Sequence, residues 1–212
     1  LLHTAYGHYI GQEINKFIEA HQLHYKVAVI ASHGHTTFHM PAQQMTAQLG
    51  DGAAIAAETQ LPVVSDLRAL DVAFGGQGAP IVPIGEKMLM NEYTFFLNIG
   101  GIANVSLNAE KYVAFDVCPA NRVLNMLAND AGKPFDENGE IAASGMVHEG
   151  LLEQLNSLEY YRLPYPKSLA NDFGTDVVYG LIKSIGVSIP DALRTYSEHI
   201  TLQICNALFS LN

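Results

Sequence analysis

Three short runs of strand-forming residues follow one another closely in the second half of the chain, and they constrain the fold more than any other feature. The runs are TFFLNIGG, ANVSLN and YVAFDV, between residues 94 and 117. Runs this short and this close together predict an antiparallel meander. A helix is expected to leave the third strand, because PANRVLNMLANDAG places Pro119 near a first helical position and Gly132 at the stop.

The N-terminal part of the chain predicts a helix between two buried strands. Apolar residues from Ile10 to Ile18 recur at helical spacing and predict a first amphipathic helix over residues 5–22. KVAVIASHG then predicts a buried strand that runs into a loop, and LPVVSDL predicts a second buried strand. Between them, DGAAIAAETQ is rich in alanine and Asp51 is placed to cap it, so residues 51–60 are expected to be helical.

These two patterns indicate two domains. A segment rich in glycine and proline, GGQGAPIVP, and a polar stretch around residues 91–93 lie between them. With 212 residues, 49% of them hydrophobic, the chain is long enough to bury the cores of two modest domains. We therefore place a domain boundary near residue 91 and expect two α/β domains that face each other across a cleft.

Composition and charge argue against several classes of protein. The formal net charge is −10 and the eleven Lys and Arg residues are scattered, which disfavours nucleic acid and membrane partners. Cys118 and Cys205 form no CxxC pair, as expected in a reducing compartment. The apolar runs are too short to span a bilayer and no signal peptide opens the chain, so we expect a soluble, cytoplasmic protein.

Because the chain starts at Leu1 and stops within an apparent helix, both ends are expected to be cuts through a longer protein.

Three polar motifs follow predicted strands: ASHGHT, SDLRALD and NIGGIAN. Ligands of α/β sheets bind beyond the carboxyl ends of the strands, so the motifs predict one active site. In SDLRALD, Asp66 or Asp71 can act as a general base, an effect of roughly 10²- to 10⁴-fold in rate, and Arg68 can hold an anionic group. A helix cap with a structural ion pair is the alternative. Gln77 in GGQGAP offers an amide to a sugar or phosphate, unless that segment is only a flexible loop.

NIGGIAN offers a second binding element. Gly100 and Gly101 allow the backbone to approach a ligand and to turn N–H groups toward phosphate oxygens, with Asn98 and Asn104 beside them. An ordinary β-turn explains the same residues. No P-loop or dinucleotide fingerprint occurs in the sequence. Asp116 precedes the predicted helix and suits either a metal-bound water or a helix cap.

Three histidines, His33, His35 and His39, lie within SHGHTTFHMP. A zinc site would require the chain to curl so that all three meet. Gly34 and the two threonines favour a turn without a common direction. A polar substrate loop and a packing or surface role are the alternatives.

The chain resembles the anhydro-N-acetylmuramic acid kinases of bacterial cell-wall recycling over about residues 28–170. The resemblance rests on SHGHTTFHMP, QLGDGAAIAAETQLPVVSDLRALDVAFGGQGAPIVP, FLNIGGIANVS, FDVCPANRVLN and FDENGEIAASG, in this order and spacing. It implies an α/β, two-domain actin-like ATPase (ribonuclease H-like) fold, incomplete at both ends. Residues 1–90 would be the remainder of an N-terminal domain with substrate loops, and residues 91–212 a truncated second domain with a phosphate-binding loop and a helical insertion.

The resemblance also implies a reaction and its residues. Members open the 1,6-anhydro ring of anhydro-N-acetylmuramic acid with water and phosphorylate O6 using ATP and Mg²⁺, giving N-acetylmuramic acid 6-phosphate and ADP. Asp71 looks like the base that activates water, with Asp66 in reserve. The implied sugar-binding residues are His33, Gly34, Thr36, Arg68, Asp66 and Gln77, and the implied nucleotide-binding residues are Asn98, Gly100, Gly101, Asn104, Asp116 and Asn121. No residue is implied to bind a metal directly, the partners are the amino sugar and ATP, and a homodimer is expected.

The sequence also departs from the family pattern. The first phosphate loop, GTSxDG, and the C-terminal glycine-rich adenosine motif are absent, so the 212-residue chain alone is expected to be inactive. His35 stands where glutamine is common, and Val117 and Cys118 stand where Thr-Gly is usual. Two alternatives remain: a catalytically impaired homologue that binds or senses a sugar, and a kinase of the same superfamily for another amino sugar.

Overall fold

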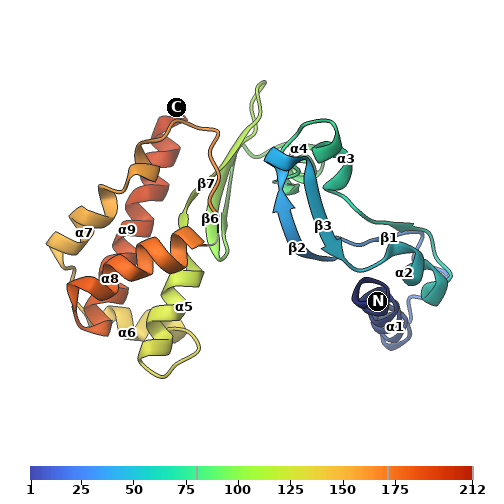
Figure 1. The fold of residues 1–212 in the computed structure, drawn as a ribbon, viewed down its shortest axis with the longest axis horizontal. Helices are drawn as coiled ribbons and strands as arrows, with labels where there is room; N and C mark the ends of the chain where they lie inside the picture. The colour runs from blue at the N-terminus through green and yellow to red at the C-terminus, as the bar shows by residue number, and fades with distance from the viewer. Residues whose placement is uncertain (80, 171, 212) are drawn as a thin grey trace. The chain divides into compact units, whose positions relative to one another are not determined.

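The computed structural model describes residues 1–79, 81–170 and 172–211 (Figure 1). The chain divides into two compact units, Leu1–Val82 and Pro83–Asn212. This division lies ahead of nearly all of helix α4 (Val82–Leu89), whereas the sequence placed the boundary near residue 91. Helix α4 is tied to the second unit because the buried Glu86 accepts a hydrogen bond from the Tyr112 hydroxyl.

The described residues of the first unit, 1–79 and 81–82, form three helices and four short strands ahead of α4. In chain order these are α1 (Leu2–Ala20), β1 (Ile30–Ala31), β2 (His35–Met40), β3 (Met45–Leu49), α2 (Gly52–Thr59), β4 (Val63–Val64) and α3 (Ala69–Ala73), with a 3-10 turn at Pro41–Gln43. Strands β1 and β4 pair in parallel, with Ile30 opposite Val63. The predicted order of strand, helix and strand is confirmed, and Asp51 caps α2 by accepting from the Ala53 N–H.

The two predicted buried strands are shorter and more exposed than expected. Each has two residues, and of the four only Ile30 is buried, while the Val64 side chain is 50% exposed. The prediction of full burial was wrong because β1 and β4 form a two-stranded sheet, which leaves much of each strand open. The hairpin of β2 and β3, with His35 opposite Leu49, was not predicted. Every residue of β2 is exposed, so no face of the strand has to be apolar, and its sequence lacks the alternation of apolar and polar residues that predicts a strand.

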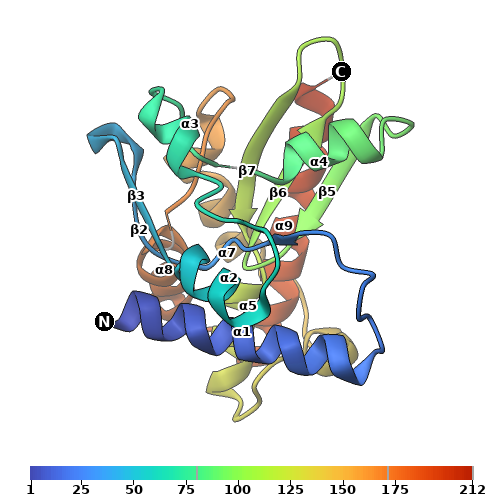
Figure 2. The same ribbon diagram turned by 90° about the vertical axis from the view of Figure 1, so that its right-hand side faces the viewer.

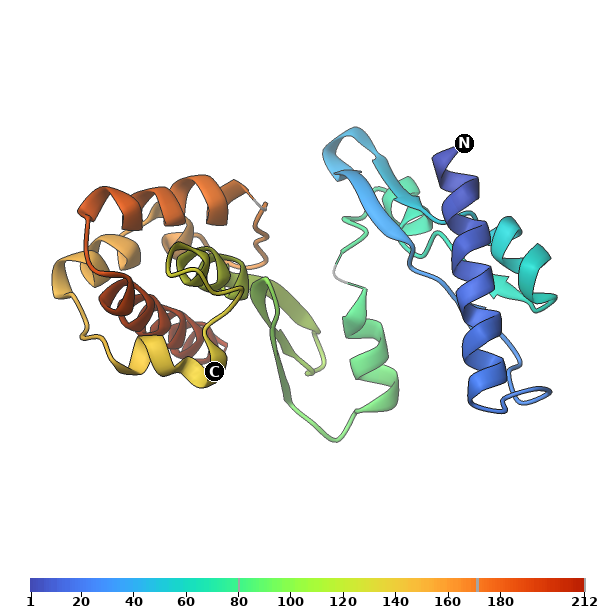
Figure 3. The ribbon, with the colours of Figure 1, turned by 90° about the horizontal axis from the view of Figure 1, so that it is seen from below.

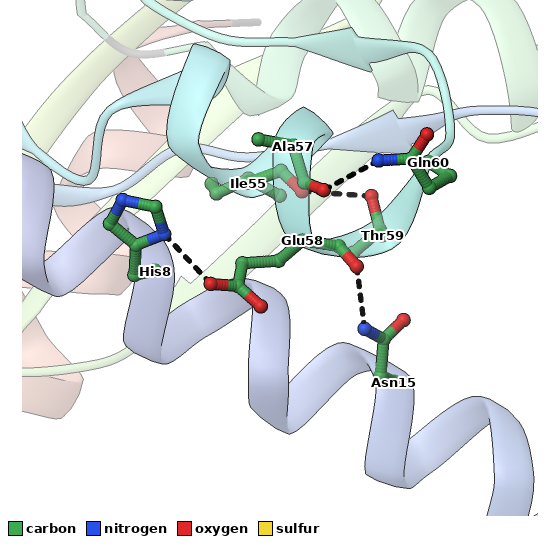
Figure 4. Close-up of polar contacts among 7 residues, drawn as sticks. All are labelled: His8, Asn15, Ile55, Ala57, Glu58, Thr59 and Gln60. Carbon is green, nitrogen blue, oxygen red and sulfur yellow. Dashed lines mark hydrogen bonds and ion pairs between the residues drawn. The ribbon is translucent and has the colours of Figure 1, made fainter.

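Helix α2 packs closely on α1 (Figure 2). Two glycines on one face of α1 permit this approach: a Cβ on Gly11 would lie 2.6 Å from Glu58 Cβ, and one on Gly7 would lie 2.6 Å from Asp51 O. Glu58 adds polar contacts to the same interface, as Figure 4 shows. Its Oε1 lies 2.8 Å from His8 Nδ1, and its backbone oxygen accepts from Asn15 Nδ2 at 2.8 Å.

The second unit is an antiparallel meander covered by helices. It contains α4, β5 (Phe95–Ile99), β6 (Ile102–Leu107), β7 (Val113–Pro119), α5 (Asn121–Asp130), α6 (Glu140–Ala143), α7 (Glu149–Asn156), a π-helix (Phe173–Val178), α8 (Tyr179–Ile185) and α9 (Ile189–Ser210), with 3-10 turns at Glu137–Gly139 and Glu159–Arg162. The strand order is β5-β6-β7, which confirms the meander. Helix α5 is also confirmed, but Pro119 ends β7 and Ala120 precedes the helix.

The core of this unit lies between the sheet and α9. Helices α5, α6 and α7 pack around α9 (Figure 3). Tyr196 of α9 is fully buried, and its hydroxyl donates to Pro119 O at 2.7 Å, which ties the helix to the end of β7. Among the residues described, no helix is long and apolar enough to cross a membrane.

Candidate active-site groups in the two units

Arg68 joins the loops that follow β1 and β4. Its Nε donates to His33 Nε2 at 2.9 Å, and its Nη1 donates to Gly78 O at 2.7 Å. Because parallel strands end at the same edge of a sheet, the loops after them come together. The expected convergence of ASHGHT and SDLRALD is therefore present within the first unit. Partial burial lowers the pKa of the Arg68 guanidinium.

The contacts of His33 define its tautomer. A guanidinium N–H only donates, so Nε2 of His33 is the acceptor and carries the lone pair. Nδ1 then carries the hydrogen and donates to Gly34 O at 2.9 Å. Gly34 has φ +66, and a Cβ there would collide with Leu49 O, so glycine permits the turn that presents His33. With both ring nitrogens engaged, His33 has no free lone pair for a metal.

The GGQG loop contacts the side chain of Asp71. Asp71 lies on α3, and its Oδ2 accepts from the Gly78 N–H at 2.6 Å. A Cβ on Gly76 would overlap the Asp71 carboxylate, and Gly78 has φ +62, so two glycines allow the backbone to reach this side chain. The GGQG segment is therefore an ordered loop that contacts Asp71. Within the described ranges Arg68 forms no ion pair with Asp66 or Asp71, which argues against the structural ion pair.

His39, which the sequence grouped with His33 and His35 in a possible substrate loop, lies close to the same group. The pKa of His39 is lowered, first by partial burial and then by the charge of Arg68, while a hydrogen bond with the Gln77 backbone acts in the opposite direction. Its Nδ1 lies 3.1 Å from Thr46 Oγ1. Its place in the histidine-rich segment was the signal, and the spacing from His35 does not put the two on one face of β2, because a register shift lies between Thr36 and Phe38.

Two other predicted sugar-binding residues lie at the edges of this group. Asp66 has φ +56, and its Oδ2 accepts from Ser65 Oγ at 2.9 Å. Thr36 lies on β2 opposite Gln48 and is exposed. Arg68, His33 and Asp71 are thus connected through Gly78, whereas no hydrogen bond between described residues draws Asp66 or Thr36 into that network.

In the second unit, Asn98, Asn104 and Asp116 form a row across the three strands. Asn98 pairs with Asn104 on β5 and β6, and Asn104 pairs with Asp116 on β7, next to a register shift after Ala103. Paired residues share one face of a sheet, so the two amides and the carboxylate lie side by side. This row brings Asp116 beside Asn98 and Asn104, which the sequence placed in a different motif.

Asp116 does not cap a helix. It lies within β7, and the residue before α5 is Ala120, which makes no side-chain cap. Its Oδ2 accepts from the Leu169 N–H at 2.9 Å, and its backbone N–H donates to Lys167 O at 3.0 Å. Burial raises the pKa of the Asp116 carboxyl, and the hydrogen bond from Leu169 partly offsets this effect. The capping prediction was wrong because β7 continues to Pro119, beyond the apolar run that marked it.

The two glycines between β5 and β6 are held against the start of α5. Gly101 O accepts from the Ala120 N–H at 2.8 Å, and Gly100 O accepts from the Asn121 N–H at 3.1 Å. The Asn121 side chain also donates to Ile99 O at 3.1 Å. The glycine carbonyls therefore satisfy the first amides of the helix. In the described parts of the chain the Gly101 N–H donates to no other group, which leaves it available to an anion.

Arg122 is a residue of this region that the sequence did not single out. A Cβ built on Gly101 would lie 4.0 Å from Arg122 Nε, so the exposed guanidinium flanks the glycine turn. A cation in the first turn of a helix opposes the helix dipole. The unfavourable position of Arg122 in the first turn of α5 could have marked it as a functional residue in the sequence, because residues that break a local rule concentrate at functional sites.

Comparison with known proteins identifies the family. The sequence profile described as "Anhydro-N-acetylmuramic acid kinase" matches residues 1–211. Curated relatives with this name include proteins from Shewanella frigidimarina (42% identical over 156 residues, 69% of this chain and 42% of the relative), Paramagnetospirillum magneticum (36% over 190 residues, 87% and 53%) and Acinetobacter baylyi (41% over 177 residues, 79% and 47%). The chain spans about half the length of these relatives. It belongs to the anhydro-N-acetylmuramic acid kinase family.

Proposed function

We propose that this protein is an ATP-dependent kinase that hydrolytically opens 1,6-anhydro-N-acetylmuramic acid and phosphorylates O6, giving N-acetylmuramic acid 6-phosphate for cell-wall recycling. Family membership supports the reaction class. The structural observation that carries the proposal is the exposed carboxylate of Asp71, which the Gly78 N–H orients from a loop that also binds Arg68.

In the proposed reaction Asp71 takes a proton from water. The water oxygen forms a bond to the anomeric carbon of the sugar, and the bond from that carbon to O6 breaks. O6 then receives the terminal phosphoryl group of ATP, and ADP leaves. A positioned general base contributes roughly 10²- to 10⁴-fold to such a step. Arg68 holds the glycine loop that orients Asp71, through its bond to Gly78 O. His33, which Arg68 also contacts, and Gly34 are proposed to contact the sugar.

The second unit is proposed to bind the nucleotide. Gly100 and Gly101 form a tight turn, and the Gly101 N–H has no acceptor among the described residues. Arg122 supplies a cation beside this turn, which suits the negative charge of a phosphate chain. Asp116 is the residue that fits Mg²⁺, because kinase magnesium sites combine one or two carboxylates with substrate phosphates. When bound, Mg²⁺ would neutralise charge on the transferred phosphoryl group.

The proposal also assigns each of the two units to a domain of the kinase. We assign the first unit to an N-terminal α/β domain with substrate loops and the second to an α/β domain with the phosphate-binding turn and a helical insertion, in an actin-like, ribonuclease H-like arrangement. The meander β5-β6-β7 followed by α5 supports this assignment. A cytoplasmic location and a homodimer are part of the proposal.

The test measures formation of N-acetylmuramic acid 6-phosphate from anhydro-N-acetylmuramic acid and ATP by the complete encoded protein, using mass spectrometry. Asp71→Asn should reduce kcat by at least about 10²-fold, because the amide cannot accept the proton of water. Glu19→Gln, at an exposed position of α1, is the control and should retain most of the activity. Equal activity of Asp71→Asn and the parent would remove Asp71 from its role, and turnover of N-acetylglucosamine in place of the anhydro sugar would indicate a different substrate.

A further inference from the structure

The second unit contains a cavity of about 220 Å³ that none of the candidate catalytic or binding residues lines. It lies between β7, the segment at residues 161–167 and the last turns of α9. Figure 1 shows that segment beside β7 and the C-terminal end of α9. Phe115 and Val117 line the cavity, and they flank Asp116 in β7. Phe115 pairs with Val105, one position along from the Asn104–Asp116 pair, so the cavity lies on the opposite face of the sheet from the Asn98, Asn104 and Asp116 row.

Aromatic rings form one wall of the cavity. The Phe115 and Tyr165 rings stack with centroids 5.3 Å apart and planes 10° from parallel. Tyr161 adds a third ring. Flat rings in this arrangement favour a flat ligand, because aromatic pairs prefer offset-stacked or edge-to-face contacts.

Among the described residues that line the cavity, Lys167 is the only cation and none carries a carboxylate. Its Nζ donates to Tyr160 O at 3.0 Å and lies 4.6 Å from the centre of the Tyr160 ring. It forms no ion pair with any described residue, and partial burial lowers the pKa of its ammonium group. A half-buried ammonium without a counter-ion favours an anionic partner.

Polar groups on the other side of the cavity come from α9. Gln203 and Asn206 lie three residues apart and therefore on one face of the helix. Gln203 is fixed by a hydrogen bond from its Nε2 to Asn156 Oδ1 at 2.9 Å. The Tyr161 hydroxyl is buried and has no hydrogen-bond partner among the described residues, so it is a donor that a bound acceptor can satisfy.

We propose that this cavity binds a small molecule made of a flat ring that carries a carboxylate. The ring packs against Phe115, Tyr161 and Tyr165, and the carboxylate accepts hydrogen bonds from Lys167. The amides of Gln203 and Asn206 contact the polar edge of the ligand. This site is independent of the proposed kinase activity, because its residues belong to one unit and to the other face of the sheet.

Indole-3-acetate is a suitable probe, and indole-3-ethanol is its uncharged counterpart. Each is titrated into the ¹⁵N-labelled 212-residue chain, and amide chemical shifts are followed. Indole-3-acetate should give saturable shifts at residues 161–167 and 203–210, and indole-3-ethanol should bind at least about tenfold more weakly, equivalent to about one lost charge-assisted hydrogen bond. Absence of saturation, shifts confined to other residues, or equal binding of both probes would overturn the proposal.

Variants test the same site from the protein side. Lys167→Met removes the charge and keeps the length of the side chain, and it should weaken indole-3-acetate about tenfold or more. Ala207→Phe fills the cavity from α9 and should abolish binding. Lys183→Met is the matched control, because that lysine pairs with Asp130 and does not line this cavity. Unchanged affinity in both test variants contradicts the assignment, and the two probes decide it on the unmodified chain if a variant does not fold.

Discussion

Arg68 donates a hydrogen bond to His33 across 2.9 Å, although the two residues are 35 positions apart in the chain. Through its second bond, to Gly78 O, the same guanidinium also holds the loop that orients Asp71. One side chain thus couples the histidine loop, the end of β4 and the glycine loop. Its planar fork suits this task, since a lysine has a single donor centre.

Arg68→Lys is expected to raise the KM for the anhydro sugar by about tenfold or more, because a hydrogen bond from a charged group contributes about 1.5–3 kcal/mol. Stability should change little, since Arg68 is only partly buried. A double-mutant cycle with His33→Ala measures the coupling, which should be about 1 kcal/mol or more for residues in direct contact. Additive effects of the two substitutions would show that the contact has no role in sugar binding.

Gly76→Ala is expected to lower kcat by about 10²-fold, because the new methyl group displaces the Asp71 carboxylate and a misplacement of about 1 Å has this effect. Gly85→Ala is the control, since a Cβ at Gly85 meets no atom within 4 Å. Steady-state kinetics and thermal unfolding of both variants check the prediction. If Gly76→Ala keeps parental kcat, the glycine loop does not position the base.

Arg122→Ala is expected to raise the KM for ATP by about tenfold while the KM for the sugar stays unchanged, because a charge-assisted contact to phosphate is lost. Arg122→Lys should recover part of the effect. Arg194→Ala, at an exposed position of α9, serves as the control. A proportional change in both KM values would indicate a folding defect instead of a phosphate contact.

Gly11→Ala is expected to destabilise the protein by about 1–3 kcal/mol, because its Cβ would lie 2.6 Å from Glu58 Cβ and the two helices must separate. Gly180→Ala in α8 meets no atom within 4 Å and should stabilise by about 0.5–1 kcal/mol through helix propensity. Urea unfolding of both variants separates packing from propensity. Equal stabilisation by the two substitutions would show that α1 and α2 do not need the close approach.

The buried His199 makes stability depend on pH. Burial lowers the pKa of His199 from 6.5 to about 4, so the unfolded chain binds a proton at higher pH than the folded chain does. Its stabilising effect is complete above pH 6.5 and is lost as the pH falls toward 4, by on the order of 3 kcal/mol. Urea unfolding between pH 4.5 and 7 measures the slope.

His199→Gln should flatten this slope, because glutamine does not titrate and can still donate to Asn156 Oδ1. Tyr161→Phe removes a neighbouring hydroxyl that burial keeps protonated, and it should retain the slope of the parent protein. A parental slope in His199→Gln assigns the pH dependence to other groups.

Elements with a local signature were predictable from the sequence. The period of α1, the Asp51 cap of α2, the three strands of the meander and helix α5 all appear where their residues predict them. Neighbouring residues are sufficient for these features, because helical spacing, caps and turns act over a few positions. The hairpin β2–β3 lacks such a signature, since all side chains of β2 are exposed and the buried position of β3 is the polar Gln48.

The sequence by itself determined the local elements, the motifs at the ends of β1, β4 and β5, and the family. Only the tertiary structure decided that Arg68 bonds His33, that Gly76 and Gly78 contact Asp71, and that Asp116 lies within β7. These relationships depend on strand pairing, burial and backbone dihedrals that residues far apart in the chain set together. Such contacts leave no period in the sequence, because each one joins segments whose separation follows from the fold.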